Sequence, residues 1–205
     1  KEIYEQPAVV RTNLEVYLNP EAAQPINLGI NDPTFLDNID HIQIVACGTS
    51  WHASLVGKYL LEQLAGIPTF VHYASEFRYS PSPIMPNTLT IGVTQSGETA
   101  DTLAALRLAK EIGYKASLTV CNVPGSSLVR ESDLAVMTNA GAEIGVASTK
   151  AFTTQLVALL MLTAALGKQK GMTAEKQKQI VSALSSLPAK LEEALTMSEG
   201  IEKMA

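Results

Sequence analysis

The sequence predicts one α/β domain with three layers, in which helices cover both faces of a doubly wound, five-stranded parallel β-sheet. Its composition supports a large buried core, since 46% of the 205 residues are hydrophobic. Aromatic residues make up only 5%, so the core must consist of Val, Ile, Leu and Ala, as is typical of a sheet buried between helices. Short apolar runs also alternate with segments of helical period, the order that produces parallel strands.

The predicted strands are short apolar runs bounded by glycine, proline or hydroxyl-bearing residues. They lie at 42–47, 69–73, 88–94, 116–121 and 134–138. Apolar residues at helical spacing predict helices over 51–64, 99–112 and 149–166, and glycines follow the first two. The third helix is apolar around most of its surface, so we expect it to be buried on most sides.

The two ends of the chain differ from this alternating body. We expect residues 1–35 to be a lead-in with a short helix near 8–18, and residues 36–170 to form the domain. Residues 171–205 are predicted to be helical, with a break near Pro188, and are too polar to build a second core. We interpret them as a linker toward a domain beyond this sequence.

Charge, hydropathy and cysteine usage narrow the class of protein. The net charge is −5 with no run of Lys and Arg, which argues against a nucleic-acid partner. No unbroken apolar segment is long enough to predict a membrane span. Cys47 and Cys121 lack metal-ligand spacing, so we expect two buried free thiols in a reducing compartment, the cytoplasm, and no bound metal. The charged opening at Lys1 is no signal peptide, and we expect the sequence to begin inside a longer protein or after processing.

Two hydroxyl-rich turns carry the functional signal. Cys47-Gly48-Thr49-Ser50 closes the first predicted strand and Thr94-Gln95-Ser96-Gly97-Glu98-Thr99 closes the third, each ahead of a helix. If the strands lie in the order 2-1-3-4-5, both turns meet at the crevice where open parallel sheets bind ligands. Free N–H groups at a helix start, together with hydroxyls, suit an oxyanion. Because such residues also cap helices, we favour capping for either turn alone and ligand binding for the pair.

A third segment, 139–150, follows the last predicted strand and enters the long helix. Its glycines allow backbone contact with a sugar. Glu143 could accept hydrogen bonds from sugar hydroxyls or be solvated. Lys150 could act as a base, but we favour an exposed lysine. Glu98, in the second turn, is expected to point away from the anion. The histidines lie outside the turns and are expected to be structural or exposed: His41, His52 and His72.

These segments resemble the sugar-isomerase (SIS) domain family. The resemblance rests on Cys47–Ser50, Thr94–Thr102, Cys121–Ser127 and Glu143–Lys150, together with the opening Lys1–Pro7. Within the family, the similarity is greatest to the first of two tandem SIS domains in synthases that make glucosamine 6-phosphate from fructose 6-phosphate and glutamine. It implies a flavodoxin-like strand order of 2-1-3-4-5 and a hexose 6-phosphate ligand.

The resemblance also implies roles for individual residues. Those that would bind the phosphate are Thr94, Gln95, Ser96 and Thr99, with Ser50 close by. Thr94 stands where the family pattern usually has serine, and it keeps the hydroxyl. Those that would contact the sugar are Cys47, Gly48 and Thr49, with the backbone of Val146.

Catalysis is expected to lie outside this chain. The resemblance implies that the acid–base Glu, the Schiff-base Lys and the ring-opening His come from the second SIS domain or a neighbouring subunit, so we expect no catalytic residue and no cofactor here. The expected partners are a glutaminase domain, a second SIS domain and a second copy in a homodimer. Two alternatives stay open: a phosphosugar-sensing regulatory domain, and an assembly module that dimerises through the helix at 149–166.

Overall fold

The sheet has five parallel strands in the order β2-β1-β3-β4-β5, which confirms the predicted topology. The structure, a computed structural model, describes residues 1–22, 24–29, 34–80 and 83–204. Each strand lies within one residue of its predicted range at both ends. The strands are β1 (His41–Ala46), β2 (Thr69–Tyr73), β3 (Thr88–Val93), β4 (Ala116–Cys121) and β5 (Leu134–Met137).

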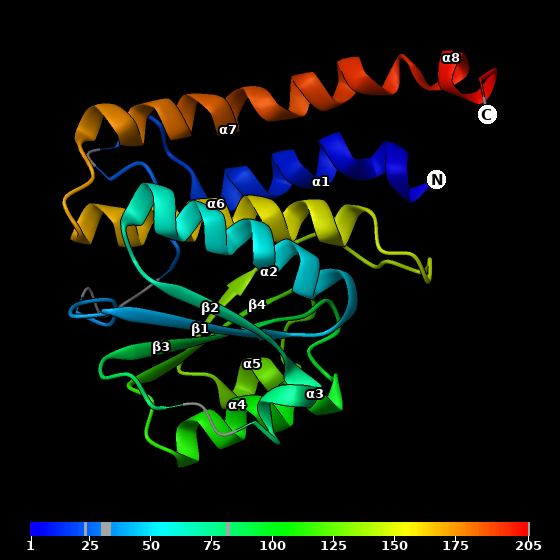
Figure 1. Ribbon diagram of the computed structural model, residues 1–205. Coiled ribbons are helices and arrows are strands. Elements are labelled where there is room, and N and C mark those ends of the chain that lie inside the picture. The colour runs from blue at the N-terminus through cyan, green and yellow to red at the C-terminus, as the bar shows by residue number, and fades with distance from the viewer. Residues whose placement is uncertain (23, 30–33, 81–82, 205) are drawn as a thin grey trace.

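Helices cover both faces of the sheet, as Figure 1 shows. On one face lie α2 (Gly48–Leu60), which continues into a π-helical turn, η1 (Leu61–Ala65), and α6 (Lys150–Gln169). The opposite face is covered by α3 (Ala74–Phe77), α4 (Ala100–Glu111) and α5 (Ser127–Glu131). Outside α6, two further helices, α1 (Glu2–Tyr17) and α7 (Ala174–Leu195), run side by side, and α8 (Ser198–Glu202) follows.

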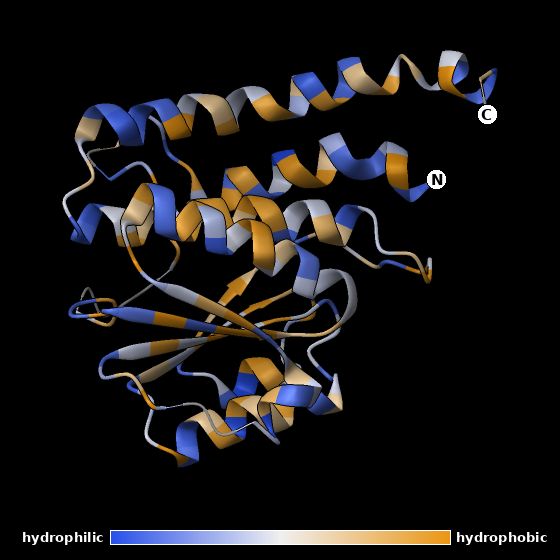
Figure 2. Ribbon diagram, in the orientation of Figure 1, coloured by the Kyte–Doolittle hydropathy of each residue, from blue (hydrophilic) through white to orange (hydrophobic). Residues whose placement is uncertain are grey.

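The core lies between the sheet and its helices. All six residues of β3 are buried, as are five of the six in β1, because both strands are covered on both faces. Ile42, Ile44 and Ile91 have no exposed surface. Figure 2 shows the hydrophobic residues on the strands and on the inner sides of the helices, with polar residues along the outer side of α7.

Helix α6 is the principal core helix, as the sequence predicts. Thirteen of its 20 residues are buried. By length and composition alone this helix could cross a bilayer, but 72% of its apolar window is buried inside the molecule. It packs on α1, α2 and α7 and on strand β4, so its apolar side chains are largely used within the chain.

The first helix is longer than predicted, because it includes Pro7 instead of starting after it. A proline lacks the N–H that would bond the carbonyl four residues earlier, here that of Ile3. The Gln6 side chain supplies the missing donor, with Nε2 3.1 Å from that carbonyl oxygen. Further along α1, Asn13 and Tyr17 bond backbone groups of β5 and of the residue that follows it. The helix thereby pairs part of a sheet edge that would otherwise be open.

The predicted break at Pro188 is wrong. Helix α7 runs through this proline, which is buried together with Ile180, Val181 and Leu184. These residues form the face that packs on α1, and the Arg11–Glu192 ion pair, 2.7 Å long, joins the two helices at the surface. Tertiary packing of an amphipathic face outweighs the single hydrogen bond that a proline removes.

Candidate functional site

The two hydroxyl-rich turns start side by side at the carboxyl edge of the sheet. Strands β1 and β3 are hydrogen-bonded neighbours, and Ala46 pairs with Val93 at their ends. The next residues along each strand are therefore Cys47 and Thr94, the first residues of the two turns. A weak contact of 4.0 Å between the Thr102 hydroxyl and the Cys47 sulfur joins the helix after the second turn to the first turn. The predicted juxtaposition is confirmed.

The first turn leads directly into α2. Cys47 is extended and half-buried, not fully buried as expected, and Gly48 has a φ of +58°, which favours glycine. Thr49 is exposed, whereas Ser50, the third residue of the helix, is buried. No side chain of the N-cap residue bonds the first turn of α2. The first backbone N–H groups of this helix, which have no partner within a helix, therefore receive no cap bond from Cys47.

The second turn is folded by its own hydroxyl groups. The buried Thr94 Oγ1 accepts a hydrogen bond from the Gly97 amide at 3.2 Å and lies 3.5 Å from the Thr99 hydroxyl. Ser96 Oγ accepts from the Glu98 amide, also at 3.2 Å. The Gln95 carbonyl oxygen accepts from the Asn122 amide at 3.2 Å, which ties the turn to the end of β4.

Gly97 is required where this turn passes α5. Its φ is +70°, and a Cβ atom built on it would lie 1.9 Å from Ser126 Oγ and 2.5 Å from Ser126 Cβ. The buried Cys121 sulfur would be 2.9 Å away. A side chain at this position would therefore force the turn away from the residues just before α5.

The alternative that the hydroxyl-rich turns only cap helices can be tested at the helix starts in the structure. Thr99 precedes α4 but its side chain forms no cap bond, and α2 is also without one. In contrast, Thr173 caps α7, and Glu143 accepts from the amides of Thr149 and Ala151 at the start of α6. Among the described residues, the helix starts of α2 and α4 thus receive no cap bond from their N-cap side chains, as is also the case for α1, α3 and α8, whereas α6 and α7 are capped.

The two carboxylates singled out from the sequence, Glu98 and Glu143, accept hydrogen bonds from backbone amides at helix starts. Glu98 points away from the turn, as predicted: its Oε1 accepts from the Ser127 amide at 2.7 Å, and this bond holds the pKa of Glu98 below its ordinary value. Glu143, expected to be solvated or to contact a sugar, instead caps α6 and accepts from Ser148 Oγ at 3.0 Å. Both carboxylates thus have backbone amide partners at helix starts.

The expectation for Lys150 is wrong. Its side chain is 5% exposed, and its Nζ lies 2.7 Å from a carboxylate oxygen of Glu5 on α1. A buried ammonium group needs such a partner. No local pattern in the sequence could have predicted it, because the two residues are 145 positions apart.

Val146 lies in the loop between β5 and α6 and is fully exposed, as is most of Ile144. This loop is held by Glu2, whose carboxylate accepts from the amides of Ile144 at 2.7 Å and Gly145 at 3.2 Å. The bond from Ile144 is the main reason that the pKa of Glu2 is lowered. No described contact joins Val146 to either turn, so its predicted backbone contact stays a prediction.

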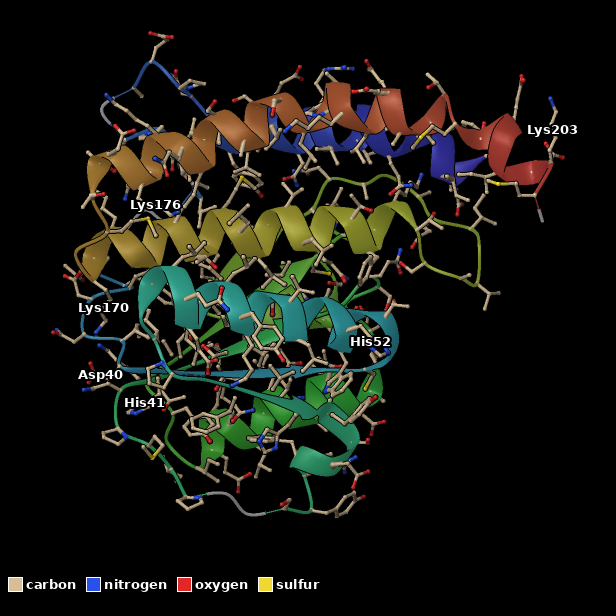
Figure 3. All side chains as sticks on the ribbon, turned by 45° about the horizontal axis from the view of Figure 1, so that its top comes forward. Asp40, His41, His52, Lys170, Lys176 and Lys203 are labelled. Atoms are coloured by element: carbon tan, nitrogen blue, oxygen red, sulfur yellow. The ribbon has the colours of Figure 1, made fainter. Side chains whose placement is uncertain are left out.

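The three histidines occupy different parts of the molecule, and Figure 3 shows His41 and His52 at opposite ends of the β1–α2 unit. His41 Nδ1 lies 3.1 Å from the Pro86 carbonyl oxygen. His52 is exposed beside Trp51, with the ring centroids 5.1 Å apart. His72 is half-buried against Phe77, and burial lowers its pKa.

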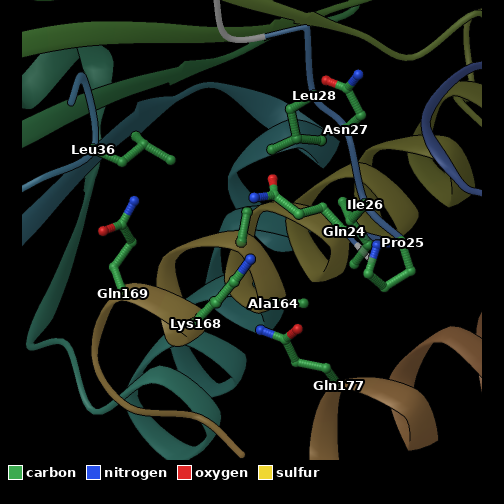
Figure 4. Close-up of a pocket in the computed structure, with 11 residues that line it drawn as sticks. Gln24, Pro25, Ile26, Asn27, Leu28, Leu36, Ala164, Lys168, Gln169 and Gln177 are labelled. Carbon is green, nitrogen blue, oxygen red and sulfur yellow. The ribbon is translucent and has the colours of Figure 1, made fainter. Parts of the chain in front are cut away.

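A separate cavity of about 430 Å³ lies at the carboxyl end of α6, whereas the hydroxyl-rich turns lie near the edge where α6 begins. Figure 4 shows its lining, which consists of amide and aliphatic side chains and Lys168, from the segment before β1, α6 and α7. This cavity shares no residue with the predicted site.

One buried amide beside the first turn was missed by the sequence analysis. Gln155 of α6 donates from Nε2 to Ser50 Oγ at 3.0 Å and is 1% exposed. The available signal was its position as a polar residue inside the apolar stretch of that helix. A polar side chain on a buried helix face needs a partner, which predicts a contact but not its identity.

The fold and the turns define a class: an open α/β domain that presents uncapped helix starts and hydroxyls at the carboxyl edge of its central strands. Within that class, the chain belongs to the SIS domain family, whose model matches residues 35–165.

Relatives of this chain are enzymes of about three times its length. It is 57% identical over 205 residues to a glutamine–fructose-6-phosphate aminotransferase (isomerizing) of Idiomarina loihiensis, and 58% identical to that of Photorhabdus laumondii. Each alignment covers 100% of this chain and 34% of the relative. The chain therefore spans about a third of the length of these relatives.

Solved structures agree with this relationship. The C-terminal domain of glucosamine-fructose-6-phosphate aminotransferase from Francisella tularensis is 44% identical with a TM-score of 0.93, over 99% of this chain and 56% of that one. A glucosamine-6-phosphate deaminase from Thermotoga maritima is 24% identical with a TM-score of 0.65, over 88% of this chain and 51% of that one. The second likeness shows the shared fold alone.

Proposed function

We propose that this chain is the first of two SIS domains in an isomerizing glutamine–fructose-6-phosphate aminotransferase, and that it binds the hexose 6-phosphate of that reaction. The parent enzyme would convert fructose 6-phosphate and glutamine to glucosamine 6-phosphate and glutamate in amino-sugar synthesis. The alignment of the whole of this chain with a third of an aminotransferase, at 57% identity, supports this assignment.

The observation that carries the proposal is the pair of uncapped helix starts on neighbouring strands. Helices α2 and α4 both begin at the carboxyl edge of the sheet with free backbone N–H groups. Helix N-termini carry partial positive charge and commonly hold phosphate groups. Two such starts beside each other can share one phosphate without a lysine or arginine side chain.

The hydroxyl groups in the turns add to these donors. Ser96 Oγ accepts a hydrogen bond from a backbone amide, and Ser50 Oγ accepts one from a side-chain amide. A hydroxyl that accepts still has its own hydrogen to donate. The group that would hold the phosphate is Ser50, Thr94, Gln95, Ser96 and Thr99, and Cys47, Gly48, Thr49 and the Val146 backbone would face the sugar.

The chemistry would be done elsewhere in the parent enzyme. Isomerisation of a ketose to an aldose needs a positioned acid and base. Lys150 is paired with Glu5, Glu143 caps α6, and His41 contacts a backbone carbonyl. We propose that a second SIS domain, a glutaminase domain and a second copy in a cytoplasmic homodimer complete the enzyme, with residues 171–205 leading to the second SIS domain.

Calorimetric titration with fructose 6-phosphate, glucosamine 6-phosphate and fructose tests this function. The two phosphates should bind and fructose should not. Ser96→Ala should weaken phosphate-sugar binding by roughly tenfold or more, since a hydrogen bond to a charged group contributes about 1.5–3 kcal/mol. Ser186→Ala, on the exposed side of α7, is the matched control. Equal binding of fructose and its phosphate, or isomerisation by this chain alone, would contradict the proposal.

A further inference from the structure

We propose that Gln155 is a positioning residue that holds the Ser50 hydroxyl with its hydrogen directed at the bound phosphate. This inference rests on the function proposed above and assigns a role to a residue outside both turns. Gln155 would not touch the ligand and would act through Ser50.

The contact is buried and specific. Gln155 lies in the second turn of α6, and Ser50 lies in the first turn of α2, 105 positions earlier. Gln155 is 1% exposed and Ser50 is 7% exposed, and Gln155 Nε2 lies 3.0 Å from Ser50 Oγ. Water therefore cannot easily replace either partner.

The direction of this hydrogen bond decides what the hydroxyl can do. A serine hydroxyl has one hydrogen and two acceptor sites. Gln155 uses an acceptor site, and within the described part of the chain Ser50 Oγ forms no second hydrogen bond. Its hydrogen is thus available at the start of α2, where the backbone N–H groups also lack a side-chain cap.

Three further contacts fix the geometry of the pair. The Ser50 carbonyl oxygen accepts from Ser54 Oγ at 2.7 Å, which holds the backbone of this turn. On the other side, the start of α6 is held by the Glu143 cap and by the Lys150–Glu5 ion pair. The amide is thereby presented to Ser50 by a helix that is anchored at its own start.

Packing alone does not explain an amide at this position. Gln155 Oε1 is buried and has no hydrogen-bond partner among the described residues. Leaving a buried acceptor unpaired is unfavourable, and a leucine of similar size would avoid it. The compensating gain is the donor that Gln155 gives to Ser50, and the same kind of arrangement recurs at Ser96, which accepts from a backbone amide.

A double-mutant cycle on the 205-residue chain tests the inference, with fructose 6-phosphate affinity measured by calorimetry. Gln155→Leu should weaken binding about tenfold, as expected for a misdirected hydrogen bond to a charged group. Gln155→Glu should weaken it more, because a carboxylate accepts only and would draw the Ser50 hydrogen away from the phosphate. In a Ser50→Ala background, Gln155→Leu should have no further effect on affinity.

Thr163→Val is the control, because Thr163 is buried in the same helix and, within the part of the chain that the structure describes, its hydroxyl bonds only the Leu159 carbonyl oxygen of its own helix. It should leave affinity unchanged. If Gln155→Leu does not fold, Gln155→Met replaces it in the same cycle. The positioning role is overturned if Gln155→Leu and Gln155→Glu leave the affinity unchanged. It is also overturned if Gln155→Leu lowers the affinity equally in the unaltered chain and in the Ser50→Ala background. Absence of binding by the unaltered chain would instead refute the proposed function.

Discussion

Replacing Gly97 by alanine should destabilise the domain and disable the second turn together. The new Cβ would occupy a backbone conformation with φ of +70°, which costs an L-residue about 1–2 kcal/mol. It would also approach Ser126 Cβ to 2.5 Å. That carbon is attached to the backbone and cannot rotate away, so the chain itself must shift, at a further cost of about 1–3 kcal/mol.

Gly66→Ala separates these two contributions. Gly66 has nearly the same φ, +67°, but nothing lies within 4 Å of its Cβ position. This variant should lose only the conformational part, about 1–2 kcal/mol, so Gly97→Ala should be the less stable of the two by about 1–3 kcal/mol. Urea unfolding at equilibrium measures the difference in the free energy of unfolding.

The same two variants should differ in ligand binding. Displacement of the turn in Gly97→Ala should reduce fructose 6-phosphate affinity at least about tenfold, because the hydroxyl and amide donors must be placed to within a few tenths of an ångström. Gly66→Ala should bind normally. Adding Ser126→Gly to Gly97→Ala should restore part of the lost stability. Equal free energies of unfolding for the two alanine variants would refute the steric argument.

Two further predictions concern charged groups. Burial lowers the pKa of His72, so protonation opposes folding, and the stability of the domain should fall as the pH drops below about 6.5. His72→Gln should reduce the change in melting temperature between about pH 7.5 and 5.5. The same pH dependence in the variant and the unaltered chain would contradict this. Glu5→Gln should lower the melting temperature more than Lys150→Met. The first substitution leaves a buried ammonium group unpaired, whereas the second leaves only a partly exposed carboxylate without its partner. The opposite order in thermal denaturation would be inconsistent with the burial of Lys150.

The order of elements and the position of the two turns could be predicted because they depend on local patterns. Apolar runs identify strands that are buried on both faces, and the alternation with helices implies a parallel sheet. Once β1 and β3 are neighbours, the residues after each strand must meet at one edge. Local patterns therefore suffice to predict that Cys47 and Thr94 lie together, as the pairing of β1 with β3 shows.

The remaining features depend on contacts between distant residues. The burial of Lys150 requires Glu5, and the passage of α7 through Pro188 requires the facing side of α1. Local propensity predicts an exposed lysine and a helix break in these cases, and tertiary contacts reverse both. Glu143 had the right chemistry for a hydrogen-bond acceptor, but its donors are backbone amides at the start of α6.

The mounting of the two turns on β1 and β3 has a consequence for the entropy of binding. Central strands that are buried on both faces open only when much of the domain unfolds, so the donors in these turns are largely ordered before any ligand arrives. Val146 is exposed, and the two residues before it are Ile144 and Gly145, whose amides bond the carboxylate of Glu2 on another element, α1. Binding of an anion at the turns would therefore cost little conformational entropy of the protein. Most of the entropy loss would come from ligand groups that contact and order the loop around Val146.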